Sequence, residues 1–230
     1  MESKRTFEPA NETKDTKARV IAAATRLFAE KGMDKVVLRE LTSAAGVNLA
    51  AVNYHFGSKE ALCEAVLDSL SERVNAQRLG RLREVLGAAE RAGQRPALRA
   101  ILETFIAPYL DTDAAGDGAL LVQLFIQDRI HPSEMTARIT RRHFDPLARE
   151  YIAAFARACP DVQPDDFYWR YVFTYSAVIL TASDRSRADR IAAMSLGRID
   201  GADLATQRAA LLDYLAAAIA APSRQPLAFG

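Results

Sequence analysis

Residues 38–62 read LRELTSAAGVNLAAVNYHFGSKEAL, and this stretch decides the fold. Apolar residues at helical spacing predict two short helices, over 38–45 and 49–55, joined by a turn that contains Gly46. Asn48 can cap the second helix, because its side-chain oxygen accepts a hydrogen bond from a free backbone N–H. Gly57 then breaks the chain, and Ser58 can cap the long helix that follows. Two short helices around a tight, glycine-containing turn are typical of a helix-turn-helix unit.

The second short helix carries side chains that suit a DNA duplex. In a helix-turn-helix unit this helix lies in the major groove, with its first residues at the base edges. Asn48 and Asn53 can hydrogen-bond base edges or phosphates, and a side chain as short as Ala50 or Ala51 lets the backbone approach and can touch a thymine methyl group. The sequence therefore predicts that this helix reads the bases.

Other candidate contacts surround this helix. Tyr54 and His55 can hydrogen-bond phosphates from rigid rings, and Lys59 lies in the first turn of the next helix, where free N–H groups and the helix dipole also favour a phosphate. On the first helix of the pair, Arg39 and Thr42 are expected to be exposed. The predicted DNA contacts are Arg39, Thr42, Asn48, Ala50, Ala51, Asn53, Tyr54, His55 and Lys59.

These residues closely resemble the TetR family of bacterial regulators. The resemblance covers about residues 17–67: it begins in ARVIAAATRLFAEKG, residues 18–32, and is sharpest in VNYHF, residues 52–56, followed by KEAL, residues 59–62. It implies an all-α homodimer, in which three N-terminal helices bind an operator and a C-terminal helical bundle forms the dimer face and a pocket for a small-molecule effector. One departure is Val37, where the family often has a Thr or Ser that caps the helix and contacts phosphate.

A narrower resemblance concerns the effector. The phrase GVNLAAVNYHFGSKEAL, residues 46–62, and the later PDDFYWRYVF, residues 164–173, look like the PsrA-type branch, whose members respond to fatty acids. This resemblance implies a fatty acid or acyl derivative as the effector.

The rest of the chain is helical in pattern, with few turn signals. We expect a disordered arm at 1–15, the helix-turn-helix domain at 16–57 with its first helix over 16–31, a helical effector-binding and dimerisation domain at 58–222, and a loose tail at 223–230. Within the second domain we expect a loop over 111–118, one helix over 133–158 kinked at Pro146, and an irregular or weakly helical stretch over 185–201.

Apolar and aromatic stripes in this second domain suggest a pocket and a dimer face. The expected effector-pocket residues are Phe105, Tyr109, Leu121, Phe125, Phe155, Trp169 and Phe173, although such stripes form core more often than pocket. The expected dimer face is a four-helix bundle built from residues 165–183 and 203–221 of each subunit, with Leu211, Leu212, Leu215 and Ile219 on one side.

Arginines at positions 73, 78, 81 and 83 form a basic cluster on the expected long helix. A solvated helix face is the ordinary interpretation. The functional alternative is that they meet an anionic head group of the effector, a carboxylate or a phosphate, near the mouth of the pocket.

Composition bears on the expected partner, compartment and cofactors of the protein. The net charge is only +1, so the case for DNA depends on the motif. No apolar run is long enough for a membrane helix, and the polar N-terminus resembles no signal segment, so we expect a cytoplasmic protein. The two cysteines, Cys63 and Cys159, fit no metal spacing, and we expect neither a metal nor another cofactor.

The two other function classes are an enzyme and a helical adaptor. An enzyme is disfavoured, because the sequence has no glycine-rich phosphate loop, no HExxH and no nucleophile motif in context, and His131 and His143 are isolated. A helical adaptor that binds protein would use the N-terminal unit for packing only. A titration of duplex binding against salt distinguishes a DNA-binding regulator from such an adaptor, because binding to DNA should weaken steeply as salt rises.

Overall fold

The computed structural model describes residues 9–33, 35–110, 116–130, 133–184 and 187–223, and the regular elements in these ranges are all helices. In chain order they are α1 (Pro9–Lys31), α2 (Leu38–Ala45), α3 (Leu49–Phe56), α4 (Lys59–Arg91), α5 (Leu98–Leu110), α6 (Asp117–Ile130), α7 (Glu134–Ile139), a π-turn (Thr140–Phe144), α8 (Asp145–Ala158), α9 (Asp166–Ser183), α10 (Arg187–Met194) and α11 (Leu204–Ala220). The predicted all-α class is confirmed.

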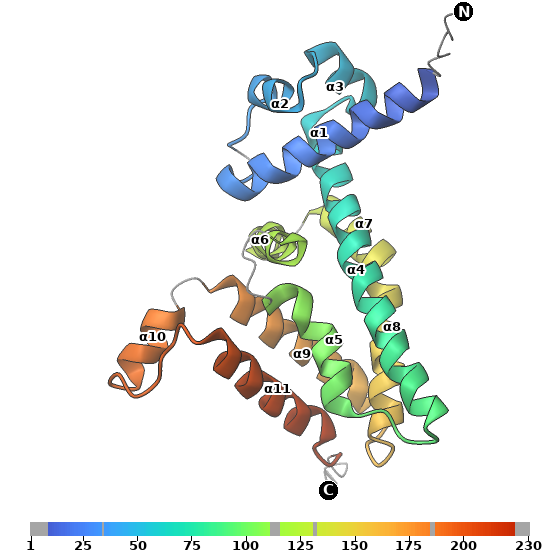
Figure 1. The fold of residues 1–230 in the computed structure, drawn as a ribbon, viewed down its shortest axis with the longest axis vertical. Coiled ribbons are helices and arrows are strands. Elements are labelled where there is room, and N and C mark those ends of the chain that lie inside the picture. Colours follow the sequence, from blue (N-terminus) through green and yellow to red (C-terminus); the bar gives the residue numbers. More distant parts are fainter. Residues whose placement is uncertain (1–8, 34, 111–115, 131–132, 185–186, 224–230) are drawn as a thin grey trace, which may run out of the picture.

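The long helix α4 joins two parts of the molecule (Figure 1). At one end of α4 lie α1, α2 and α3, which pack on one another, and α1 and α3 also contact α4. Along the rest of α4 lie α5, α6, α7 and α8, while α9 packs on α5, α6 and α8, α11 packs on α5 and α9, and α10 projects to one side. Because α4 touches both parts, a change in the larger part can reach the smaller one through this helix.

The small N-terminal unit is held by buried apolar side chains from all three of its helices, which are continuous with the core of the rest of the protein. Val20, Ala24 and Phe28 of α1 are buried against Leu41 of α2 and Val52 of α3. The sequence-predicted ends are confirmed: Gly46 adopts the left-handed conformation after α2, with φ of 62°, and the Asn48 side chain accepts a hydrogen bond from the backbone N–H of Ala51. Ser58 caps α4 in the same way. Local turn and cap chemistry therefore sets the short helices in place.

The disordered arm predicted for residues 1–15 is wrong for residues 9–15, which form the first turns of α1. This segment has no apolar stripe, so no helical periodicity marks it. A helix nucleated by the buried stripe downstream extends at little cost, since each added residue only propagates it, and Pro9 suits a first turn. Residues 1–8 of the predicted arm and 224–230 of the predicted tail lie outside the described residues.

The single helix predicted over 133–158 is divided into three pieces. The α-helical hydrogen bonding of α7 changes at Thr140–Phe144 to a π-turn, in which the N–H of Asp145 donates to the carbonyl of Thr140. Pro146 follows at the start of α8. Because proline has no N–H and cannot continue the helical ladder, an irregularity just before it is expected, and here it takes the form of an inserted residue rather than a simple kink.

Other departures are smaller. The stretch predicted as irregular or weakly helical contains the regular helix α10, and α6 begins inside the predicted loop, most of which lies outside the described residues. Among the described helices, none combines the length and apolar character needed to cross a bilayer.

Candidate nucleic-acid interface and internal pocket

The outer face of α3 is polar and exposed while its inner face is anchored. Val52 is buried in the core of the small unit, whereas Asn53 and Ala50 are exposed and Tyr54 is 82% exposed. The Tyr54 ring meets His55 edge to face, with ring centroids 5.3 Å apart. A rigid helix with a large hydroxyl-bearing ring pointing outward can bind an extended polar partner without first ordering itself.

Asn48 has a divided role at the start of α3. Its Oδ1 accepts from the Ala51 N–H at 2.7 Å, so the side-chain oxygen serves the cap and the NH2 group is left to face an external acceptor. This geometry favours a phosphate contact from Asn48, since a base edge that requires both donor and acceptor is better served by Asn53.

A groove runs between α3 and the N-terminal half of α1. It is lined by Thr13 and Thr16 of α1 and by Asn48, Ala50, Ala51, Tyr54 and His55. The two threonines were not predicted as site residues, because their segment was expected to be disordered. The helical start of α1 therefore adds a second edge to the predicted reading surface.

Thr42 does not occupy the place that the sequence predicts. It is only 9% exposed, and its hydroxyl donates to the Arg39 carbonyl at 2.9 Å, so it packs inward within α2. Arg39 is exposed as expected, and Lys59 is half-buried in the first turn of α4, beside the Ser58 cap. Val37 precedes α2 without a side-chain cap hydrogen bond, as the departure at this position implied.

The turn between α2 and α3 is held from the side by α1. Arg19 Nη2 donates to the carbonyl of Ala45 at 2.7 Å and to that of Gly46 at 2.8 Å. One guanidinium thus satisfies two carbonyls of the turn and fixes the angle between the two short helices.

Substituting alanine for Gly46 should destabilise this unit by about 1–2 kcal/mol, because φ is +62° and a Cβ would lie 2.8 Å from Arg19 Nη2. Thermal unfolding measures the loss, and duplex binding should weaken with it. Gly80→Ala is the matched control: its Cβ would meet no atom within 4 Å inside α4, so stability should stay the same or rise. Equal destabilisation by the two variants would contradict the proposed importance of the left-handed turn at Gly46 and its contact with Arg19.

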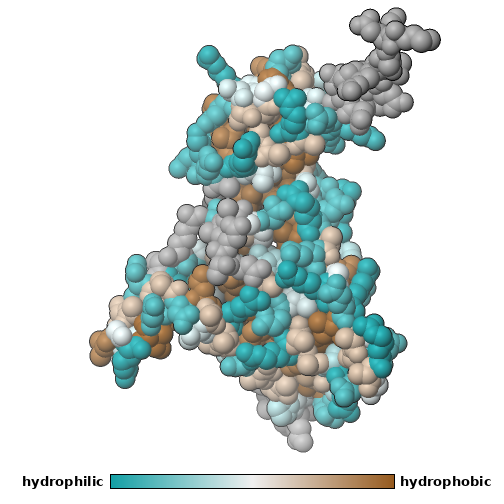
Figure 2. Space-filling view, in the orientation of Figure 1, coloured by the Kyte–Doolittle hydropathy of each residue, from teal (hydrophilic) through white to brown (hydrophobic). Residues whose placement is uncertain are grey.

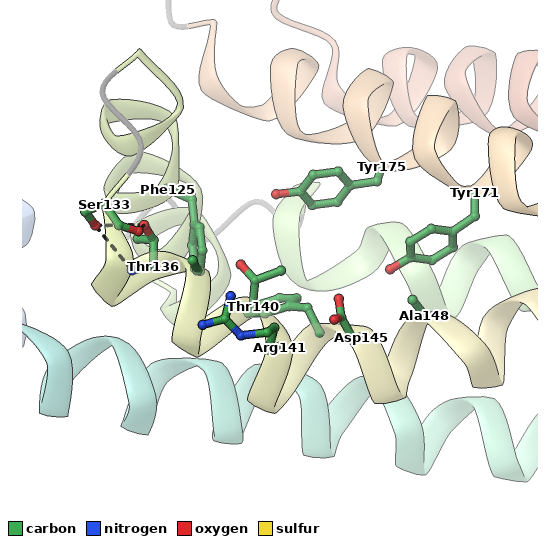
Figure 3. A pocket seen from close by; sticks show the side chains of 11 residues that line it. Phe125, Ser133, Thr136, Thr140, Arg141, Asp145, Ala148, Tyr171 and Tyr175 are labelled. Carbon is green, nitrogen blue, oxygen red and sulfur yellow. Dashed lines mark hydrogen bonds between the residues drawn. The ribbon is translucent and has the colours of Figure 1, made fainter.

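A pocket of about 430 Å³ lies in the larger part, between α6, α7, the π-turn, α8 and α9 (Figure 3). Aromatic rings of Phe125, Phe144, Tyr171 and Tyr175 form much of its wall, and its polar groups include Arg141. Burial raises the pKa of Tyr171 to about 12, so its hydroxyl stays protonated and can donate a hydrogen bond. The complete lining is Phe125, Ser133, Thr136, Ala137, Thr140, Arg141, Phe144, Asp145, Ala148, Tyr171 and Tyr175.

The predicted pocket residues divide into three groups. Phe125 lines the pocket, and Tyr109 and Leu121 line a small void that shares Phe125, Phe144 and Tyr175 with it. Phe105 and Phe155 are fully buried in the core and line neither space. Trp169 and Phe173 point away from the pocket, at 66% and 63% exposed on the outer face of α9. Their prediction as pocket residues is wrong, because periodicity cannot tell an inward face from an outward apolar one.

The residues predicted for the dimer face point toward the core of their own subunit. Leu212, Leu215 and Ile219 are buried within their own subunit, where α11 packs on α5 and α9, and Leu211 is half-buried against the same core. The exposed side of α11 carries Tyr214 instead. The leucine-rich side of this helix therefore completes the subunit core.

Large exposed apolar side chains concentrate on α9 and near α10. On α9 they are Tyr168, Trp169, Val172, Phe173 and Leu180, and at the α10 end they are Met194, Leu196 and Ile199. Figure 2 shows hydrophobic surface at the projecting α10 end. A patch of this kind marks an interaction surface more often than it marks a free one.

A helix-turn-helix unit joined by one long helix to a helical domain with a pocket is the architecture of a one-chain transcriptional regulator. Residues 20–66 match the family model described as bacterial regulatory proteins of the tetR family, and residues 103–218 match the tetracyclin repressor-like C-terminal domain. The chain belongs to the TetR family of transcriptional regulators.

Individual relatives agree with this family. The chain is 41% identical over 61 residues to the regulator TtgR of Pseudomonas putida, a match that covers 26% of this chain and only 29% of TtgR. It is 24% identical over 157 residues to the regulator UidR of Escherichia coli, covering 67% of this chain and 72% of UidR. The structure of Salmonella enterica GusR superposes with a TM-score of 0.61 at 23% identity, over 92% of this chain and 98% of that one. The structural likeness supports the fold.

Proposed function

We propose that the protein is a homodimeric repressor that binds a near-palindromic operator and is released by a small, largely hydrophobic effector. The observation that carries this proposal is the outer face of α3, where exposed Asn53 and Tyr54 stand on a helix anchored by buried Val52. In this proposal α3 enters the major groove, Asn53 reads a base edge, and Asn48, Tyr54, His55 and Lys59 hold phosphates.

The proposed dimer face consists of the outer sides of α9 and α11. Trp169 and Phe173 stack with ring centroids 6.1 Å apart, and Tyr214 on α11 is also exposed. A second copy of the chain is the occupant that we propose, since two such helices from each subunit make a four-helix interface. Two reading helices would then lie about 34 Å apart, one turn of B-DNA, which requires an operator with two-fold symmetry.

The π-turn links the pocket to α4. On one side Thr140, Arg141 and Phe144 line the pocket. On the other, Asn75 Nδ2 donates to the His143 carbonyl at 2.9 Å, and the Asp68 carboxylate lies 2.6 Å from His143 Nε2 and 3.2 Å from an Arg142 guanidinium nitrogen. We propose that an effector shifts this turn and thereby α4, because a ligand acts only through a conformation that it binds better.

Asp68→Asn should weaken this link. We expect the effector to release the variant from DNA about fivefold less effectively than the wild type, with little change in affinity for DNA alone. The measurement is the ratio of duplex dissociation constants with and without effector. Glu84→Gln, at an exposed position of α4, is the control and should leave the ratio unchanged. A normal ratio in Asp68→Asn would rule out this route.

Duplex binding in a series of salt concentrations tests the proposed function. A protein that neutralises several phosphates should lose affinity steeply, by about 10³-fold or more between 50 and 200 mM salt. A helical adaptor would bind no duplex at any salt concentration.

A further inference from the structure

Arg78, in the middle of α4, belongs to the basic cluster for which the sequence left open a solvated face or a contact with an anionic head group, and the structure places it in the core. It is 1% exposed. Its guanidinium carbon lies 4.4 Å from the centroid of the Phe105 ring, 5.0 Å from that of Tyr151 and 5.2 Å from that of Tyr109. The residues described by the structure provide no carboxylate for it, so a permanent positive charge is surrounded by rings.

The hydrogen bonds of Arg78 leave one edge of the guanidinium unused. Nη1 donates to the Tyr109 hydroxyl at 3.0 Å and to Asn75 Oδ1 at 3.3 Å. Nε and Nη2 are buried and have no acceptor among the described residues. The rings stabilise the charge through cation–π contacts and the nearby Tyr151 hydroxyl adds to this stabilisation, but Nε and Nη2 make no well-formed hydrogen bond with the described residues.

The unused atoms form the edge that binds a carboxylate best. Nε and Nη2 lie on the same side of the guanidinium and can donate in parallel to two oxygens. Two other arginines of this protein use that edge in this way. Arg73 donates to Asp117 from Nε at 2.6 Å and from Nη2 at 3.1 Å, and Arg138 donates to Glu64 from Nε at 3.1 Å and from Nη2 at 2.6 Å.

Arg78 lies directly behind the aromatic wall of the pocket. Tyr171, a pocket residue, packs edge-on against Phe105 with ring centroids 5.8 Å apart, and Phe105 covers the guanidinium. The small void beneath the pocket extends to Tyr109, whose hydroxyl is bonded to Arg78. A ligand that displaces the Tyr171 ring together with Phe105, or that extends the small void past Tyr109, would therefore meet the guanidinium.

We propose that the effector is an organic carboxylate whose carboxyl group pairs with Arg78 while its apolar body lies between Phe125, Phe144 and Tyr175. This inference rests on the proposed function and specifies the chemical class of its effector. A single planar carboxylate matches both the one uncompensated charge and the two parallel donors.

Pairing of a carboxylate with Arg78 would also affect the π-turn, through the side chain of Asn75. The Asn75 side chain accepts from Arg78 through Oδ1 and donates to the His143 carbonyl through Nδ2. A carboxylate that draws the Arg78 guanidinium toward the pocket would change this bridge, and with it the contact between α4 and the pocket wall.

Thermal unfolding and calorimetry of the full-length protein with acetate, hexanoate and benzoate, each against its own amide, test the proposal. At fixed ionic strength we expect saturable stabilisation by the carboxylates and about 100-fold weaker binding of the amides. Arg78→Met should stay folded, because apolar replacement of a buried charge is tolerated, and should lose the preference for carboxylates. Arg91→Gln, which changes an exposed arginine at the end of α4 outside the pocket lining, is the matched control and should keep that preference.

The side-chain Nε–H signal of Arg78 in the wild type gives a readout that depends on no variant. It should shift on titration with hexanoate and not with hexanamide or chloride. Equal binding of acids and amides, an equal response to chloride, or no shift and no stabilisation by any of the three acids up to about 50 mM, far weaker than an effector site requires, would overturn the inference. Duplex binding without ligand is measured in parallel: its loss would count against the proposed function, whereas intact duplex binding with no carboxylate response would count against this inference alone.

Discussion

Replacing Trp169 and Phe173 together by glutamate should convert the protein into a monomer and lower its affinity for the operator by about 10²–10⁴-fold. Both rings are more than 60% exposed on α9, and neither supports the core of its own subunit. Two added carboxylates per subunit would meet their symmetry mates across the proposed interface, where burying unpaired charge is strongly unfavourable. Light scattering after size-exclusion chromatography measures the assembly state, and duplex titration measures the affinity.

The size of the effect comes from the linkage of two weak half-site interactions. In a dimer, binding of the second α3 is intramolecular, and this advantage disappears when the subunits separate. Glutamates at Ala88 and Ala92, at the exposed far end of α4, provide a matched control that adds the same charge away from the interface. A dimeric Trp169→Glu/Phe173→Glu variant with normal operator affinity would show that subunits associate elsewhere.

On the reading surface, the largest single effects should come from Lys59 and Tyr54. Lys59→Ala should weaken binding to every duplex by about 100-fold or more, since a charged phosphate contact worth about 1.5–3 kcal/mol is lost twice per dimer. Tyr54→Phe removes only a hydroxyl worth about 1 kcal/mol in each subunit, so about 30-fold is expected. Fluorescence anisotropy with the operator and an unrelated duplex measures both losses, and Lys59→Ala should reduce the salt slope.

Asn53 should behave differently from these two residues. If Asn53 reads a base edge, Asn53→Ala should relax the preference at one position of each half-site while binding to unrelated duplexes changes little. Tyr168→Phe, which removes a tyrosine hydroxyl from the exposed face of α9, is the control for Tyr54→Phe. Operator binding like that of the wild type in all three reading-surface variants would remove α3 from the interface.

Local chemistry made the N-terminal unit predictable. Gly46 permits the left-handed turn and Asn48 supplies the cap, and both effects depend on residues within a few positions along the chain. The same is true of Ser58 at the start of α4. The extension of α1 to Pro9 escaped prediction, because a polar segment without a buried stripe gives no periodic signal although a neighbouring helix can propagate into it.

Features set by tertiary packing escaped prediction. Arg78 looks like a surface residue in any pattern that treats charge as exposed, yet three aromatic rings from other helices enclose it. Trp169 was predicted to line the pocket and is exposed, whereas Leu215 was predicted to lie on the dimer face and is buried. Both lie on apolar helical faces, and only the packed structure tells which face turns inward. The π-turn lies next to Pro146. The sequence predicted an irregularity at this position but not that it would be a π-turn.

Selection from a pool of random duplexes with the purified full-length protein tests the central claim most directly, namely that two copies of α3 read one duplex. The account predicts enrichment of a two-fold symmetric site with half-site centres about 10 base pairs apart, bound by one dimer. An enriched site without symmetry, or no enrichment above the starting pool, would contradict it.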